Sequence, residues 1–206
     1  MDTQDGLVVG AGRAAVAGGV LGLASLVTVL VGEVTKGTGF MDTTAAALAG
    51  WAGFLAASLM VVGLLGVAAR HAAALSATGR VALLVLGFAT AVTVGASSTL
   101  ALVVPSLVER VPGLVTDPPA AVPPTFILSG LVMGICAVVL SVGLRRSGAI
   151  SRGVARFLVV AAVLTMVPLP SRFFLLAFAL GVLALAPQAA RGKVEDRQVG
   201  AAAVPA

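Results

Sequence analysis

Long runs of apolar residues dominate the chain, and short polar or proline-rich stretches separate them. A helix that crosses a bilayer needs about 20 consecutive, mainly apolar residues. Four charge-free windows reach that length, and two shorter ones follow. The windows are residues 14–32, 44–69, 81–104, 125–144, 153–168 and 173–187. The pattern therefore predicts an all-α fold, a polytopic transmembrane helix bundle of six spans that occupies residues 1–187.

The last two windows are short, and the segment Val167-Pro168-Leu169-Pro170 lies between them. Proline removes a backbone donor and disfavours helix at the residue before it. With Ser171 and Arg172, this segment predicts a tight external turn between two short crossings. The alternative is a single helix that continues through both prolines. Short crossings can be accommodated by local bilayer thinning or by packing against longer helices.

Composition agrees with a membrane location. The chain is 59% hydrophobic and only 10% charged, whereas soluble domains are about 45–50% apolar and about 25% charged. Asn and Tyr are absent, and two Lys stand against eleven Arg. We interpret this usage as the codon bias of a GC-rich bacterial genome. The expected location is the plasma membrane, with the lipid bilayer as the surrounding partner.

The basic residues predict the orientation. With the amino terminus inside, ten Lys and Arg residues fall on inner segments, and only Lys36, Arg110 and Arg172 fall outside. Cytoplasmic loops normally carry the excess of Lys and Arg. Both termini are therefore predicted to be cytoplasmic, with residues 188–206 as a disordered cytoplasmic tail. Orientation also explains the net charge of +5, so no nucleic-acid partner is expected.

The residues that usually carry catalysis or bind metals are sparse. His71 is the only histidine and Cys136 the only cysteine, whereas a zinc site needs about four ligands. His71 is predicted to be exposed in an inner loop, and Cys136 to be a small buried residue in mid-span. We predict no catalytic, metal or cofactor site, no cofactor, and no enzymatic activity.

Hydroxyl side chains gather on two helix faces. Thr90, Thr93 and Ser97 have the i, i+3, i+7 spacing of one face, and Ser25 and Thr28 lie in the first window. Small and hydroxyl residues favour close packing of membrane helices. The same residues also permit a second interpretation, a polar cavity between the first, third and fourth spans.

Charged residues flank the outer ends of two spans. Glu33 ends the first span, and Arg172 precedes the last one. One interpretation is an outer-face charge pair at a ligand site or gate. The other is that both residues anchor helix ends at the interface.

Three features of the chain resemble a group of uncharacterised six-helix bacterial integral membrane proteins, a domain family of unknown function. They are the Arg-led first span (Arg13-Ala14-Ala15-Val16-Ala17-Gly18-Gly19), the Val104-Pro105 exit, and the hairpin from Leu144-Arg145-Arg146-Ser147-Gly148 to Gly153-Val154-Ala155-Arg156. The resemblance implies a six-helix architecture and no particular activity.

Two functional hypotheses follow. The first is a non-enzymatic structural or interaction subunit, with a membrane protein or a second copy of the chain as its partner. The second is a transporter or channel for a small solute or lipid, which would use the hydroxyl-lined helix face.

Overall fold

A computed structural model of the protein describes residues 3–40, 43–103, 122–167 and 173–186. The described residues form α-helices and short 3-10 segments and contain no strand. The α-helices are α1 (Thr3–Lys36), α2 (Thr44–His71), α3 (Ala77–Leu102), α6 (Val122–Arg146), α7 (Arg152–Met166) and α8 (Phe174–Leu185). The 3-10 segments are η1 (Gly37–Phe40) and η2 (Ala72–Ala74). The all-α prediction is confirmed for these residues.

Local sequence determines where several helices begin. Thr43, Ser76 and Ser151 precede α2, α3 and α7, and each side chain accepts a hydrogen bond from the backbone N–H three residues later. This is the favoured N-cap arrangement, because the first N–H groups of a helix have no partner within the helix. Helix α7 ends at Met166, just before the Pro168–Pro170 segment, so the described helices on either side are separate.

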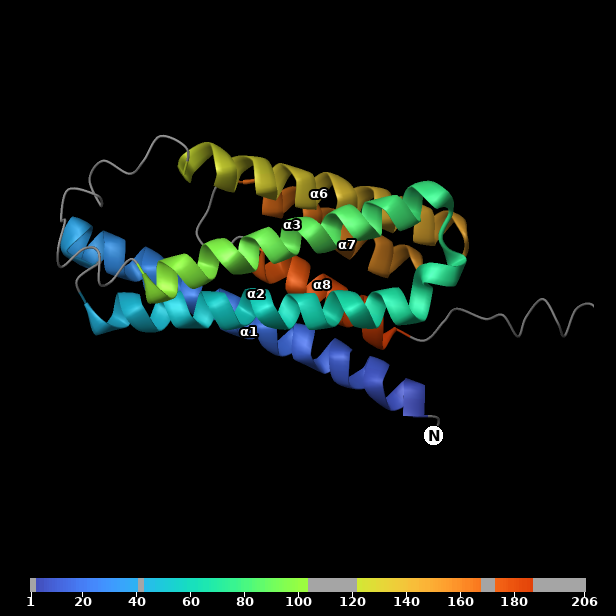
Figure 1. The fold of residues 1–206 in the computed structure, drawn as a ribbon, viewed down its shortest axis with the longest axis horizontal. Coiled ribbons are helices and arrows are strands. Elements are labelled where there is room, and N and C mark those ends of the chain that lie inside the picture. Colours follow the sequence, from blue (N-terminus) through green and yellow to red (C-terminus); the bar gives the residue numbers. More distant parts are fainter. Residues whose placement is uncertain (1–2, 41–42, 104–121, 168–172, 187–206) are drawn as a thin grey trace, which may run out of the picture.

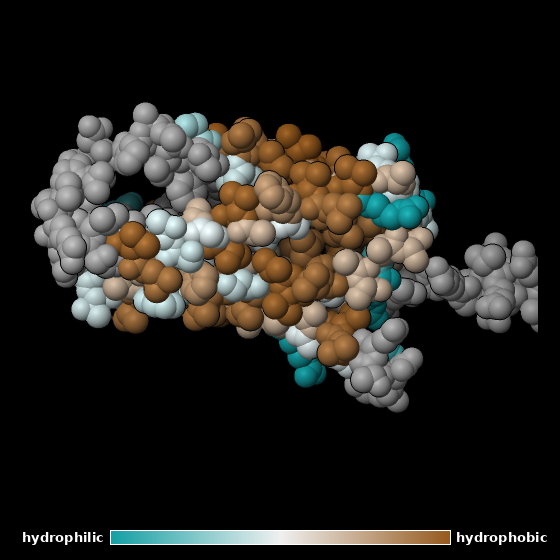
Figure 2. Space-filling model, viewed as in Figure 1, coloured by the Kyte–Doolittle hydropathy of each residue, from teal (hydrophilic) through white to brown (hydrophobic). Residues whose placement is uncertain are grey.

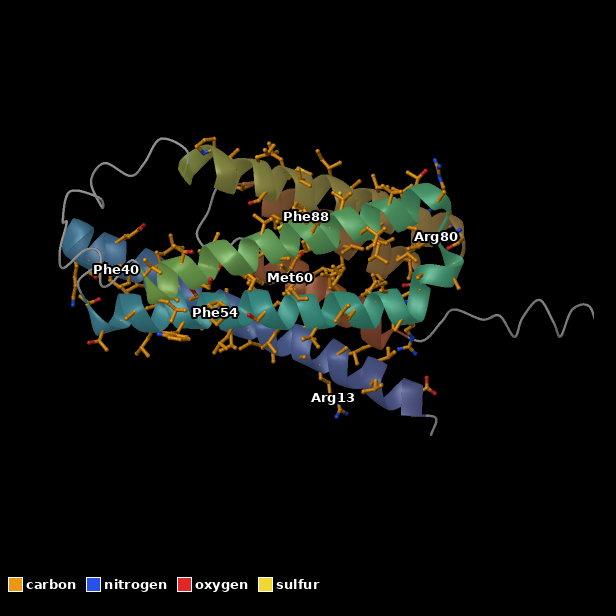
Figure 3. The ribbon with its side chains drawn as sticks, in the orientation of Figure 1. Arg13, Phe40, Phe54, Met60, Arg80 and Phe88 are labelled. Atoms are coloured by element: carbon orange, nitrogen blue, oxygen red, sulfur yellow. The ribbon has the colours of Figure 1, made fainter. Side chains whose placement is uncertain are left out.

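Four helices, α1, α2, α3 and α6, have the length and hydropathy needed to cross a membrane. Figure 2 shows a broad apolar surface along the bundle and hydrophilic residues at the end where the α2–α3 and α6–α7 turns lie. We call this the arginine end, because the described arginines lie toward it, whereas Phe40 lies toward the opposite end (Figure 3). The structure is compatible with a membrane-embedded protein.

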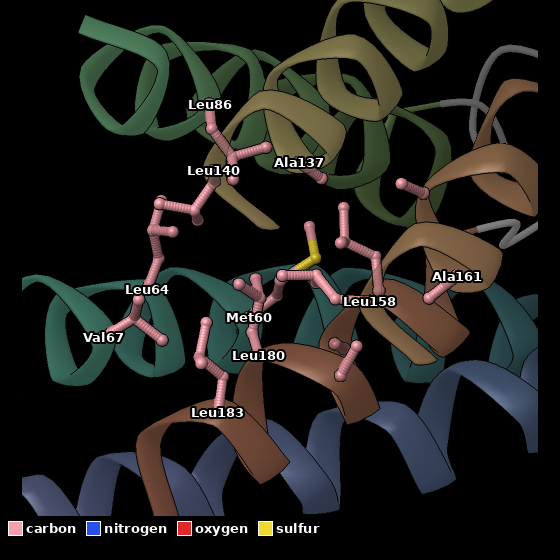
Figure 4. Close-up of a cluster of buried hydrophobic side chains, with 14 of the residues drawn as sticks. Met60, Leu64, Val67, Leu86, Ala137, Leu140, Leu158, Ala161, Leu180 and Leu183 are labelled. Carbon is pink, nitrogen blue, oxygen red and sulfur yellow. The ribbon is translucent and has the colours of Figure 1, made fainter. Parts of the chain in front are cut away.

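The helices pack in a closed order. Each of α1, α2, α3, α6, α7 and α8 contacts the next, α8 contacts α1, and α2 also contacts α8 (Figure 1). Helix α8 is the most deeply enclosed, with Leu176, Leu180 and Leu183 fully buried. The apolar core joins these leucines to Met60 of α2 and Leu158 of α7 (Figure 4).

The two short helices do not have the length of a full crossing. At about 1.5 Å per residue, α7 rises about 22 Å and α8 about 18 Å, whereas the hydrocarbon core is about 30 Å thick. Helix α8 begins beside Gly22, near the middle of α1, and α7 ends beside Gly134, near the middle of α6. The described parts of both helices therefore occupy the arginine end of the bundle, and a count of six crossings remains a prediction.

Candidate functional site

The hydroxyl face of α3 packs against α6. Thr90 is fully buried, and its hydroxyl donates to the carbonyl of Leu86 at 2.7 Å. Thr93 donates to the carbonyl of Ala89 at 2.9 Å, and its hydroxyl also lies 3.3 Å from the sulfur of Met133 on α6. Ser97 is buried on the same face. The Thr90 and Thr93 hydroxyls thus satisfy carbonyls of their own helix at a helix–helix interface.

The hydroxyls of α1 lie at a different interface. Ser25 is buried, and its hydroxyl donates to the carbonyl of Ala49 on α2 at 2.8 Å. Thr28 is half-buried and donates to the carbonyl of Ala24 in its own helix. The structure therefore does not bring the two predicted sets together, since one lies between α1 and α2 and the other between α3 and α6.

The predicted outer charge pair involves one described residue. Glu33 is exposed near the end of α1. Arg172 lies outside the described residues. The pair remains a prediction.

A polar cluster that the sequence did not predict lies at the arginine end. His71 is the last residue of α2 and is only 1% exposed, so the prediction of an exposed loop histidine was wrong. Its Nε2 lies 3.1 Å from the carbonyl oxygen of Leu183, and the neighbouring Arg70 guanidinium donates to the carbonyl of Ala184. Both acceptors belong to the last turn of α8, where carbonyls have no partner within the helix.

The physical reason for this burial is a tertiary contact. Basic side chains near the carboxyl end of a helix bond the last carbonyls and interact favourably with the helix dipole. Here α2 supplies such groups to the end of a different helix, α8. The sequence held one signal, because histidine and arginine are favoured in the last turn of a helix, but nothing in it identified α8 as the neighbour.

Further polar groups join α6 to α7. The Ser141 hydroxyl of α6 donates to the carbonyl of Ala155 on α7 at 2.9 Å, and both residues are buried. Cys136 on α6 is half-buried rather than fully buried. Among the described residues, no three His, Cys, Asp or Glu side chains are close enough to hold a metal ion.

The described geometry defines a helical bundle whose longer helices can span a membrane and whose interior is mainly apolar. No protein-family model, curated protein or solved structure matches the chain. The resemblance to uncharacterised six-helix bacterial membrane proteins therefore stays a prediction.

Proposed function

We propose that this chain is a plasma-membrane protein with six spans and cytoplasmic termini, which acts as a non-enzymatic structural or interaction subunit. The observation that carries the proposal is the use made of the buried hydroxyls. Six Ser and Thr residues are buried in the described part of the chain. Five of them, Ser25, Thr90, Thr93, Ser141 and Thr165, donate their hydroxyls to backbone carbonyls, and the sixth is Ser97. Hydroxyls used in this way support packing within and between membrane helices rather than a polar path.

The apolar interior supports the same function. Between α2, α3, α6 and α8 the core is filled by large side chains such as Met60, Leu86, Leu140 and Leu180, each 0% exposed (Figure 4). A solute pathway through membrane helices needs polar or hydroxyl groups that face a cavity. A densely filled apolar centre favours a protein that acts through its surface.

Helix α1 offers a surface for a partner. In its first part, one stripe of residues docks α8: Gly12 beside Leu185, Val16 beside Gly181, and Gly19 beside Phe178. The same stripe, at heptad spacing, continues through Leu23 and Leu30, which are each 41% exposed. Helix α8 begins beside Gly22, so among the described residues it does not extend along this continuation. A transmembrane helix of a partner, or of a second copy, fits a surface that continues an existing helix–helix contact.

Site-specific photo-crosslinking in native membranes tests this proposal. A photoreactive residue replaces Leu30, on the part of the stripe that continues beyond α8. As the control, the same residue replaces Val27. Val27 is 51% exposed. It lies on another stripe of α1, with Val20 and Val31, and that stripe is exposed both beside α8 and beyond it. We expect a discrete protein adduct from position 30 and only lipid adducts from position 27. Lipid adducts alone from both positions, or a cross-link within one chain at position 30, would contradict the proposal.

A further inference from the structure

Backbone hydrogen bonds and a serine cap define the turn between α6 and α7. The N–H of Ala149 bonds the carbonyl of Leu144, and the N–H of Gly148 bonds the carbonyl of Arg145. Gly148 has φ +72°. These two bonds around a left-handed glycine form a Schellman motif, which ends a helix in a defined geometry. Ser151 then caps α7 by accepting from the N–H of Val154. The backbone on both sides of the turn is therefore held in place.

Four exposed arginines flank this turn. Arg145 and Arg146 form the end of α6, and Arg152 and Arg156 lie in the first two turns of α7. Cations are favourable at the carboxyl end of a helix but unfavourable at the amino end, where anions are preferred. Helix α7 has no acidic residue in its first turn. The start of α7 thus combines a helix amino terminus with two arginines.

The described residues supply no anion for this cluster. Asp5 and Glu33 are the only carboxylates in the part of the chain that the structure describes, and both lie on α1. Helix α1 packs mainly on α2 and α8 rather than on α6 or α7. An anion other than the carboxylates of the described residues would balance the positive charge around the turn.

Apolar surface continues directly from the arginines. On α7 one exposed stripe runs from Arg152 and Arg156 to Val160 and Val163, which are 55% and 51% exposed. On the neighbouring α6 a similar stripe ends in Arg146. It contains Ile135 and Val142, which are 55% and 41% exposed. Two adjacent helices therefore present cations at one end and an apolar surface along their length.

We propose that the α6–α7 turn binds the phosphate of an anionic phospholipid, whose acyl chains lie along the exposed stripes of the two helices. Arginine binds phosphate oxygens through two parallel N–H donors. Clusters of Lys and Arg next to the ends of transmembrane helices are known to bind the head groups of anionic lipids. A free phosphate would use the arginines but leave the adjoining apolar stripes unused, so the phospholipid accounts for both halves of the site. This inference does not depend on the proposed interaction-subunit function.

Native mass spectrometry of the purified full chain in mild detergent tests the proposal. Phosphatidylglycerol is titrated, with phosphatidylcholine of the same acyl chains as the neutral comparison. We expect phosphatidylglycerol to bind about tenfold more tightly, and Arg156→Gln to weaken it about tenfold. Arg156→Lys, which keeps the charge but loses the paired donors, should weaken it by a smaller factor. Equal binding of both lipids would overturn the proposal.

The matched control is Arg13→Gln. Arg13 is also an exposed arginine, but it lies on α1, apart from the turn. We expect its replacement to change phosphatidylglycerol binding less than about twofold, since only general surface charge is lost. An equal loss in Arg13→Gln and Arg156→Gln would show diffuse charge attraction and would also overturn the site. Since both side chains are exposed, neither change removes a core contact.

Discussion

The two ends of the bundle are built differently. Toward the arginine end six described helices pack in a closed order, with α8 enclosed by α1, α2 and α7. Beyond the level of Gly22 and Gly134, only α1, α2, α3 and α6 continue among the described helices. Helix α1 consequently has two helical neighbours in one part and mainly α2 in the other. Close glycine contacts hold α8 against α1 at Gly12, Gly19 and Gly22, and Arg70 and His71 cap its end, so the short helix is fixed by its neighbours along its whole length.

The largest expected effect comes from breaking the contact between α8 and α1. A Cβ at Gly181 would lie 2.9 Å from both the carbonyl oxygen of Gly12 and the backbone nitrogen of Val16. Backbone atoms cannot move aside as a flexible side chain can, so Gly181→Leu should cost about 3 kcal/mol of stability. Gly95→Leu is the matched control, because a Cβ at Gly95 meets nothing within 4 Å. Thermal unfolding of the two purified variants in detergent makes the comparison, and equal melting temperatures would refute it.

Loss of the His71 cap should have the next largest effect. His71→Leu leaves the carbonyl of Leu183 without this buried partner, which should cost about 2 kcal/mol. His71→Gln offers an amide donor and should recover part of the loss. Arg80 is exposed, so Arg80→Ala should change stability by less than about 0.5 kcal/mol. Chemical unfolding in detergent measures all three variants. If His71→Leu behaves like Arg80→Ala, the buried cap does not stabilise α8.

The serine links between helices should contribute less. Ser141→Ala removes the bond from α6 to Ala155, and Ser25→Ala removes a bond from α1 to Ala49. Hydrogen bonds between membrane helices average about 0.6 kcal/mol, so each change should cost about that amount. Equilibrium unfolding of both variants tests whether the link at the arginine end matters as much as the one farther along α1. A loss above 2 kcal/mol for either would mean that the serine does more than join two helices.

For the hydroxyl face of α3 we expect no measurable effect, because cysteines placed there should not be labelled. In a Cys136→Ala background, cysteine at Thr90 or Thr93 should remain unlabelled by an impermeant thiol reagent added outside, because both positions are buried. Cysteine at Val34, which is 86% exposed near the end of α1, should react if that end is extracellular. Rapid labelling at position 90 would instead support a water-filled cavity and the transporter hypothesis. Labelling at position 34 from the cytoplasmic side alone would reverse the predicted orientation.

Much of the secondary structure was predictable because apolar runs and helix breakers act locally. The expected windows at residues 81–104 and 125–144 correspond to α3 and α6 with shifts of a few residues. The first window, residues 14–32, lies within the longer helix α1, which begins at Thr3. The charge-free window stopped at Arg13, but a helix can continue beyond such a charge, as α1 does. Apolar windows therefore locate helices better than they locate their ends.

The predictions for the hydroxyl residues and for His71 differ in what they depend on, because one rests on helical spacing and the other on contacts between helices. The spacing puts Thr90 and Thr93 on one face of a helix, because helical periodicity is a local property, and both side chains are buried. Periodicity does not identify the facing helix, so the sequence could not separate the Ser25 contact with α2 from the Thr93 contact with α6. The burial of His71 was missed because it depends on where α8 ends.

Hydropathy and charge, which act over a few neighbouring residues, were enough to predict an apolar helical chain with ten of its thirteen basic residues on one side of a membrane. The pairing of the helices, the enclosure of α8 and its capping by Arg70 and His71 depend on contacts between residues far apart in the chain. The physical reason is packing. Close contacts such as Gly12 with Leu185 form between residues far apart in the chain, and they depend on the joint arrangement of several helices.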